Sequence, residues 1–147
     1  MRAGYNEWQL HKAAVVAMRS RDPSTKCGAI IVRPNKTICS EGYNGFPKHM
    51  EDRREWYENR AEKYDRVIHA EMNAIKHAAE DIEGYAIFVT RPPCKGCAKH
   101  LASWGLIEVI WTNHSERTLT DAHKMDVSRA KVILRDCGVK MTVVHHE

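Results

Sequence analysis

Hydrophobic and polar positions along the chain follow a helical period in some segments and a strand period in others. Helices are predicted over residues 6–19, 70–80, 94–104 and 127–136, and strands over residues 27–33, 37–43, 85–90, 107–111 and 139–145. The order α-β-β-α-β-α-β-α-β predicts an α/β fold in which helices cover the faces of one five-stranded sheet. The last two strands are expected to run parallel, because a long helix-bearing connection joins them.

Two local features of this pattern are specific enough to check. Asn6 is expected to cap the first helix, on which Trp8, Val15 and Met18 form one apolar stripe. Residues 112–121, between the fourth strand and the last helix, are expected to form a polar loop.

Charged residues dominate the segment at positions 48–66. Met50, Tyr57, Ala61 and Tyr64 still fall near one helical stripe, which predicts a partly helical insertion. The simplest interpretation of its charges is a solvated face. A lid or a phosphate clamp is the alternative, because long ordered insertions are often functional.

Composition narrows the class of protein. A length of 147 residues fits a single domain spanning residues 1–147. The net charge of +4, from 23 basic and 19 acidic side chains, suits a small anionic ligand and falls short of the basic stripe typical of nucleic-acid binders. No apolar run is long enough to cross a membrane, and no targeting signal is visible. We therefore expect a cytoplasmic protein without nucleic-acid or membrane partners, whose five cysteines stay reduced.

Two short motifs carry candidate chemistry. His69 and Glu71 stand at the start of one predicted helix, and Cys94 and Cys97 stand at the start of the next. A helix N-terminus favours thiolates, and one imidazole with two thiolates makes three zinc ligands. Because zinc prefers four ligands, a set of three leaves a position for water, as in catalytic sites. Glu71 is then the base beside that water rather than a ligand.

A structural zinc site is the alternative, and it needs a fourth protein ligand. Cys27, Cys39 and Cys137 are the remaining candidates, although small reduced hydrophobic side chains are the simpler interpretation of these three. His145 and His146, at the end of the chain, are assigned no role.

A histidine-x-glutamate followed by Pro-Cys-x-x-Cys is the signature of zinc deaminases that act on nucleobases. The chain resembles the cytidine and deoxycytidylate deaminase superfamily, and within it the deoxycytidylate (dCMP) branch. The motifs that carry the resemblance lie at residues 22–32, 42–47, 69–75 and 93–99. One departure is His49, where relatives usually have glycine.

The resemblance implies a three-layer α/β/α sandwich with a mixed five-stranded sheet and a zinc cofactor. It implies that dCMP and water give dUMP and ammonia, with Glu71 as the acid and base. The main chain near Ala70 and Pro93 is expected to hold the base edge, and Asn44 the sugar. For the phosphate, the sequence does not choose among Ser24, Thr25, Lys26 and the charged insertion.

Further expectations follow from resemblance alone. Deoxycytidylate deaminases commonly form homo-oligomers, often hexamers, and are commonly controlled by dCTP and dTTP. Some viral and bacterial relatives carry an additional zinc, whose ligands have no match in this chain. Two other functions stay open: a deaminase that edits transfer RNA or another nucleic acid, and a non-catalytic binding module stabilised by zinc.

Overall fold

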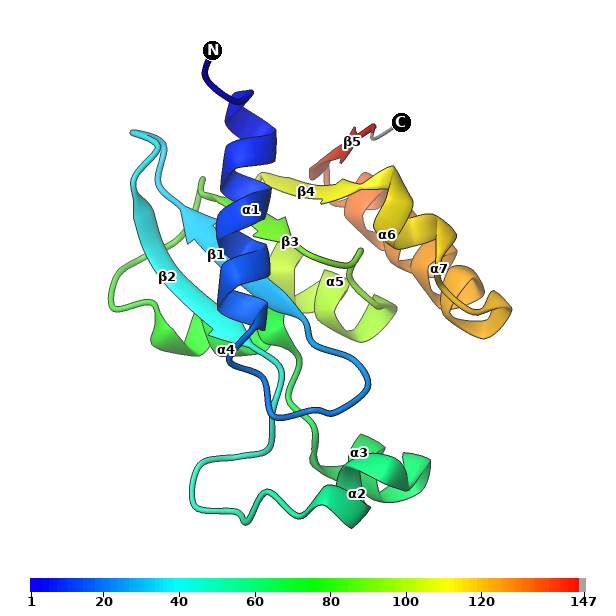
Figure 1. Ribbon diagram of the computed structural model, residues 1–147. Coiled ribbons are helices and arrows are strands. Elements are labelled where there is room, and N and C mark those ends of the chain that lie inside the picture. Colours follow the sequence, from blue (N-terminus) through cyan, green and yellow to red (C-terminus); the bar gives the residue numbers. More distant parts are fainter. Residues whose placement is uncertain (146–147) are drawn as a thin grey trace.

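The computed structural model describes residues 1–145, so His146 lies outside the described part of the chain. Its centre is a five-stranded sheet of order β2-β1-β3-β4-β5 (Figure 1). The strands are β1 (Gly28–Val32), β2 (Ile38–Tyr43), β3 (Ala86–Val89), β4 (Glu108–Thr112) and β5 (Lys140–Val144). Strand β1 pairs antiparallel with β2 and β3, whereas β3, β4 and β5 are parallel. The mixed sheet and the parallel pairing of the last two strands are thus confirmed.

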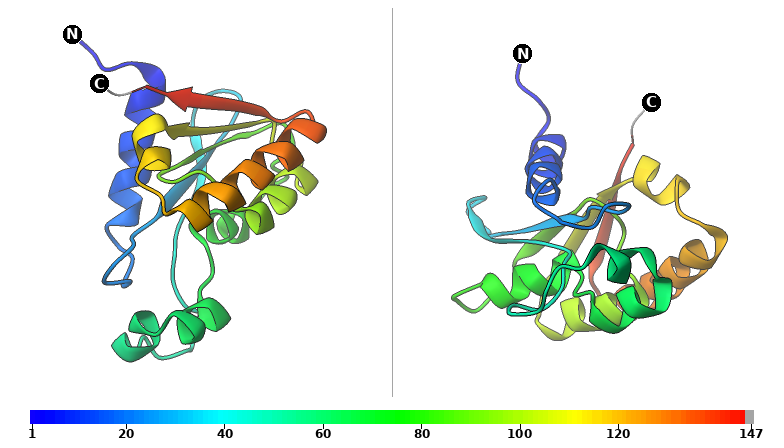
Figure 2. Two further views of the ribbon diagram at one scale, coloured as in Figure 1. Left: turned by 90° about the vertical axis from the view of Figure 1, so that its right-hand side faces the viewer. Right: turned by 60° about the horizontal axis from the view of Figure 1, so that its bottom comes forward.

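Helices cover both faces of this sheet. They are α1 (Tyr5–Ala17), α2 (Arg54–Glu58), α3 (Arg60–Arg66), α4 (Ala70–His77), α5 (Lys95–Ser103), α6 (Asn113–Arg117) and α7 (Asp121–Asp136). Helix α1 lies on one face, and α4, α5 and α7 lie on the other (Figure 2). This arrangement confirms the three-layer α/β/α sandwich.

Strand β1 shows why the central strands are continuous apolar runs. All five of its residues are buried. Ile30 and Val32 pack in the core beneath α1, and Ala29 and Ile31 pack in the larger core beneath the other helices. A strand covered on both faces has no polar side, so the two-residue alternation disappears.

The start of α1 differs from the prediction. The helix begins at Tyr5, with Gly4 in extended conformation at the cap position and no side-chain cap. Trp8 N donates to Gly4 O over 2.9 Å. Asn6 therefore lies inside the first turn and is not the cap, because the backbone already turns helical one residue earlier.

The apolar stripe predicted on α1 faces solvent and not the sheet. Trp8, Val15 and Met18 are 48%, 63% and 73% exposed. The sheet instead meets small residues of the helix: a Cβ on Gly28 would lie 2.1 Å from Ala13 O and 2.7 Å from Ala17 N. Such a close approach between a helix and a strand excludes the bulky side chains from the interface.

The polar loop predicted over residues 112–121 contains a short helix, α6, and the last helix begins at Asp121 rather than at 127. Threonine side chains cap both helices. Thr112 Oγ1 accepts from Ser115 N over 3.1 Å, and Thr120 Oγ1 accepts from His123 N over 3.2 Å. Capping by threonine is a local signal that starts a helix among polar residues.

The charged insertion is partly helical, as predicted, and forms α2 and α3 at the opposite end of the molecule from the N-terminus (Figure 1). Phe46 stacks on Tyr57, with ring centroids 3.9 Å apart and planes 6° apart. The Arg66 guanidinium lies 4.1 Å from the Trp56 ring centroid. This small aromatic core shows that the insertion is more than a solvated face. His49, near the start of the insertion, has φ 76°, a backbone conformation that favours glycine.

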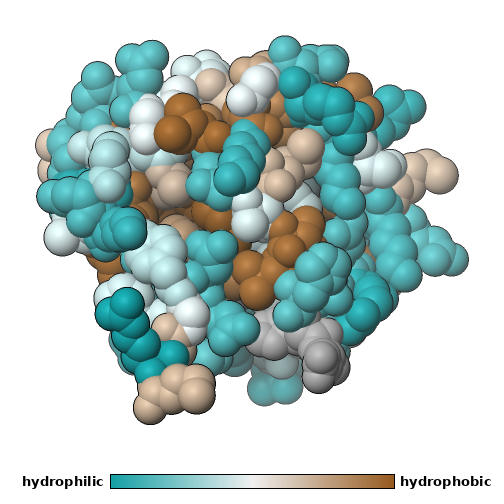
Figure 3. All heavy atoms as spheres, turned by 90° about the horizontal axis from the view of Figure 1, so that it is seen from above, coloured by the Kyte–Doolittle hydropathy of each residue, from teal (hydrophilic) through white to brown (hydrophobic). Residues whose placement is uncertain are grey.

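Apolar side chains on the surface are dispersed. Seen from the end where the N-terminus lies, separate apolar patches alternate with hydrophilic side chains (Figure 3). Within residues 1–145, no helix combines the length and apolar character needed to span a bilayer. All five cysteines are free, and Cys137 is exposed rather than packed as a small hydrophobic side chain.

Candidate active site

The two predicted motifs meet where α4 and α5 begin. His69 precedes α4 in extended conformation, and Cys94 holds the equivalent place before α5. His69 Nδ1 lies 3.2 Å from Cys97 Sγ and 3.4 Å from Cys94 Sγ. Residues separated by a whole helix and strand in the sequence therefore converge within contact distance.

Gly42 on β2 makes this position of α4 possible. A Cβ there would lie 2.3 Å from Ala74 N and 2.5 Å from Ala70 O, both backbone atoms of the helix. Ser40 Oγ, on the same strand, donates to Ala74 O over 2.7 Å. Helix α4 thus rests directly on the strand backbone, which sets where His69 and Glu71 stand.

The donor set fits a zinc ion. The ligand atoms of His69, Cys94 and Cys97 all lie within 4.8 Å of one another, and no other such group occurs among the residues described. Tetrahedral zinc, with bonds of about 2.3 Å to sulfur and about 2.0 Å to nitrogen, needs nitrogen and sulfur roughly 3.5 Å apart. The spacing observed is close to that value. Three protein ligands leave one coordination position for water or substrate.

The surroundings of Cys94 favour its thiolate form, whereas hydrogen bonding to Cys94 and burial raise the pKa of Cys97. Hydrogen bonds from Cys97 and His69 outweigh burial and lower the pKa of Cys94 to about 3. The Cys97 backbone N–H also donates to Cys94 Sγ over 3.4 Å. Hydrogen bonding to Cys94 raises the pKa of His69. A thiolate is the form of cysteine that binds metal.

Glu71 lies beside the three ligands but is not one of them. Its side chain belongs to a residue only 7% exposed, and burial raises the pKa of the carboxyl. A raised pKa makes a carboxyl group suited to receive and return a proton near neutral pH.

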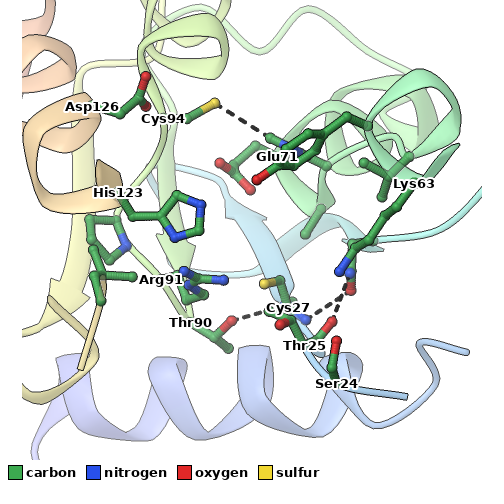
Figure 4. A pocket seen from close by; sticks show the side chains of 18 of the residues that line it. Ser24, Thr25, Cys27, Lys63, Glu71, Thr90, Arg91, Cys94, His123 and Asp126 are labelled. Atoms are coloured by element: carbon green, nitrogen blue, oxygen red, sulfur yellow. Dashed lines mark hydrogen bonds between the residues drawn. The ribbon is translucent and has the colours of Figure 1, made fainter. Parts of the chain in front are cut away.

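His69, Glu71 and Cys94 form part of the wall of a cavity of about 540 Å³. Figure 4 shows the side chains that surround it. Among the predicted substrate-binding residues, Ser24, Thr25, Asn44 and Ala70 line the cavity. Its size and its single metal-binding group correspond to a site for one small molecule.

Asn44 is held rigidly by the chain itself. Its Oδ1 accepts from Cys27 N over 2.8 Å, and its Nδ2 donates to Thr25 O over 2.9 Å. Asp22 also holds the same loop, because its Oδ1 accepts hydrogen bonds from Ser24 N and Thr25 N at 3.0 and 3.1 Å. The loop that carries Ser24 and Thr25 is therefore preorganised against Asn44.

Two predicted residues lie outside the cavity lining. Lys26 is exposed, and its Nζ donates to Ser20 O and Asp22 O at 2.5 and 3.0 Å, which keeps it on the outer side of the loop. Pro93 is buried, and the neighbouring Pro92 lines the cavity in its place.

Sequence reasoning missed several residues of the lining. The insertion contributes Tyr57, Glu58, Arg60, Lys63 and Tyr64, and other segments contribute Cys27, Arg91, His123 and Asp126. Burial raises the pKa of Cys27 to about 11, so its thiol is protonated. Arg91 is the one with a local signal, since it stands three residues before Cys94. His123 and Asp126 come from a helix whose start the sequence placed too late.

The chain matches the model of the cytidine and deoxycytidylate deaminase zinc-binding region over residues 5–113. It is 40% identical over 119 residues to the deoxycytidylate deaminase of Mus musculus, covering 75% of this chain and 67% of the relative. It is also 37% identical over 131 residues to an uncharacterised deaminase, encoded in the luxG 3′ region of Aliivibrio fischeri, covering 88% of this chain and 86% of that one.

A solved structure agrees with this similarity. The crystal structure of dCMP deaminase from the cyanophage S-TIM5, in apo form, superposes with a TM-score of 0.75 at 26% identity. The match covers 98% of this chain and all of the cyanophage chain. The same sheet and helix layers therefore occur in an enzyme of similar size.

Proposed function

The chain belongs to the cytidine and deoxycytidylate deaminase family, and we propose that it converts dCMP and water to dUMP and ammonia. The observation that carries the proposal is the convergence of His69, Cys94 and Cys97, the first two of which line a cavity that Glu71 also lines. Similarity to a murine and a cyanophage dCMP deaminase supports the choice of substrate.

His69, Cys94 and Cys97 would hold the zinc. When bound, the ion supplies a Lewis acid that lowers the pKa of a water molecule. Because His69 and Cys94 line the cavity, a zinc ion held by the three residues would be within reach of a molecule bound there.

Glu71 moves the protons. Its carboxylate takes a proton from water and gives it to N3 of the cytosine ring while the oxygen adds to C4. The same carboxyl then carries the second proton of the water to the amine, and the C4–N4 bond breaks to release ammonia. The two protons and the oxygen of one water molecule are thereby all accounted for.

The rest of the cavity orients the nucleotide. We assign the base edge to the main chain at Ala70 and at Pro92–Pro93, and the sugar to the wall around Asn44. Because the side-chain amide of Asn44 is engaged with the 25–27 loop, its main contribution is to hold that wall in place. Ser24 and Thr25 complete the side of the cavity nearest the sugar.

Family membership also suggests the domain extent, location, assembly and regulation of this protein. We propose one deaminase domain across residues 1–147, a cytoplasmic location, assembly as a homo-oligomer such as a hexamer, and control by dCTP and dTTP. Five free cysteines accord with a reducing compartment. A nucleic-acid editing role is less well supported, because the charge excess is only +4.

The test is ammonia release from purified enzyme with dCMP, deoxycytidine, and cytosine or adenosine within an oligonucleotide. We expect kcat/KM for dCMP to exceed that for deoxycytidine by about a hundredfold or more, given two charge-assisted phosphate contacts. Equal rates on dCMP and deoxycytidine would exclude a nucleotide deaminase. Activity on the oligonucleotide alone would establish the editing alternative instead.

A further inference from the structure

Three long basic side chains line the cavity, and only one of them is neutralised. Lys63 Nζ lies 2.5 Å from Asp22 Oδ2, and the Asp22 side chain is fully buried. No carboxylate of residues 1–145 forms an ion pair with Arg60 or Arg91. Two guanidinium groups therefore face the cavity with no anionic partner.

The acidic side chains of the lining do not supply one. Glu58 binds Arg54 at 2.6 Å, on the outside of α2. Asp126 accepts from Lys95 N over 2.9 Å, at the start of α5. Glu71 is buried beside the metal ligands. None of these three carboxylates therefore forms an ion pair with Arg60 or Arg91.

His123 lines the cavity together with the two arginines. It projects from α7 into the cavity, on the same side as Arg91 and opposite Lys63 (Figure 4). Burial lowers the pKa of His123, and the charges of Arg91 and Arg60 lower it further. The two guanidinium groups, from segments 31 residues apart in the sequence, thus act on the same imidazole. An anion between them would be stabilised by all three groups.

We propose that Arg91, His123 and Arg60 form the subsite for the 5′-phosphate of the nucleotide substrate. This inference rests on the proposed function and adds which residues make the enzyme select a nucleotide over a nucleoside. A guanidinium group presents a rigid fork of donors that matches phosphate oxygens. Arg60 belongs to the insertion, whereas Arg91 and His123 belong to the sandwich, so the phosphate joins the insertion to the rest of the molecule.

The 24–26 loop is a weaker candidate for this role. Ser24 Oγ already donates to Asp22 Oδ1 over 3.1 Å, and Lys26 is turned to the outer side of the loop. Ser24 and Lys26 are therefore used to build the loop, whereas the charged insertion, which the sequence also offers for the phosphate, contributes Arg60 to the cavity. Arg60 and Arg91 have no ion-pair partner among residues 1–145.

The first experiment compares Arg91→Gln with Lys124→Gln, which removes the same charge from an exposed position of α7 outside the cavity. We expect Arg91→Gln to lower kcat/KM for dCMP by about ten- to a hundredfold. The value for deoxycytidine should stay within about twofold, and Lys124→Gln should change neither. Equal losses on both substrates would overturn the subsite, whereas a wild-type enzyme that does not prefer dCMP would overturn the proposed function.

A second measurement is independent of turnover. Binding of dUMP and of deoxyuridine is measured by calorimetry for wild type, Arg60→Gln and Arg91→Gln, with zinc content confirmed. Arg60 is exposed, so its replacement leaves folding intact. We expect both variants to weaken dUMP binding by about tenfold or more and to leave deoxyuridine binding unchanged. Unchanged dUMP affinity in both variants would place the phosphate elsewhere.

Discussion

Glu71 and His69 stand only two residues apart, yet their environments differ. Glu71 is 7% exposed and points into the interior at the cavity wall, whereas His69 is exposed beside the cysteines. Burial raises the pKa of Glu71. One histidine can therefore act as a ligand while the neighbouring carboxyl, held outside the ligand set, exchanges protons.

Replacing Glu71 by glutamine keeps the shape of the side chain and removes its ability to take a proton. We expect turnover of dCMP by Glu71→Gln to fall by about a hundred- to ten-thousandfold. Zinc content should stay at the wild-type level, because Glu71 is not a ligand. Ammonia release and metal analysis check the two expectations, with the exposed Glu41→Gln as the control. Near-normal turnover would assign the base to another residue.

At the scale of elements, the position of α4 depends on the missing side chain of Gly42. Helix α4 carries Glu71 and follows His69, and its backbone approaches β2 closely enough to exclude a Cβ. The equivalent contact beneath α1 involves Gly28. On each face of the sheet, a glycine thus determines how closely a helix approaches: Gly28 on β1 for α1, and Gly42 on β2 for α4.

Gly42→Ala should move α4 away from the sheet, because the clash is with backbone atoms that cannot rotate aside. We expect a loss of unfolding free energy of about 2–3 kcal/mol, typical of overpacking, together with weaker zinc retention. Gly45→Ala is the matched control, since nothing lies within 4 Å of a Cβ there. Urea denaturation and metal analysis measure both effects, and a Gly42→Ala protein as stable as the control would contradict this account.

At the scale of the whole molecule, the cavity exists because the insertion is attached to the sandwich. One attachment is the ion pair between Lys63, on α3, and the buried Asp22; the stack of Phe46 on Tyr57 is another. Burial alone would raise the pKa of Asp22, but hydrogen bonds from Lys63, Ser24 N and Thr25 N hold the pKa below its ordinary value. One carboxylate thus connects the insertion, the 24–25 loop and Asn44.

This linkage predicts a dependence of stability on pH. Because the folded-state pKa of Asp22 is lowered, its contribution is fully present above the unfolded pKa of about 3.9 and is lost as the pH falls through the folded value. We expect Asp22→Asn to cost about 3 kcal/mol at pH 7, and the difference from wild type to shrink below about pH 4. Urea denaturation across this range is the measurement, with the exposed Asp65→Asn as control. A difference that stays constant with pH would show that the charge of Asp22 contributes nothing.

Local signals account for what could be predicted of the fold. The strands, the parallel pairing of the last two strands and the helices that carry the metal motifs follow from periodicity and connection length. The cap predicted at Asn6 is wrong, and the stripe at Trp8, Val15 and Met18 faces solvent. Nothing local reveals that Gly28 brings the sheet against the small face of α1. Hydrophobicity alone cannot decide which face a helix buries when close approach requires small side chains.

The sequence by itself determined the metal-binding set and its acid–base partner, because each half of that set is a motif of a few residues at a helix start. Only the tertiary structure decided which cations surround the cavity. Lys26 lies beside the predicted site in sequence but turns outward, whereas Arg60, Arg91 and His123 come from three separate segments. A phosphate is recognised by charges gathered from several elements. Their convergence depends on how the insertion and α7 pack around the sheet, and that packing leaves no local trace in the chain.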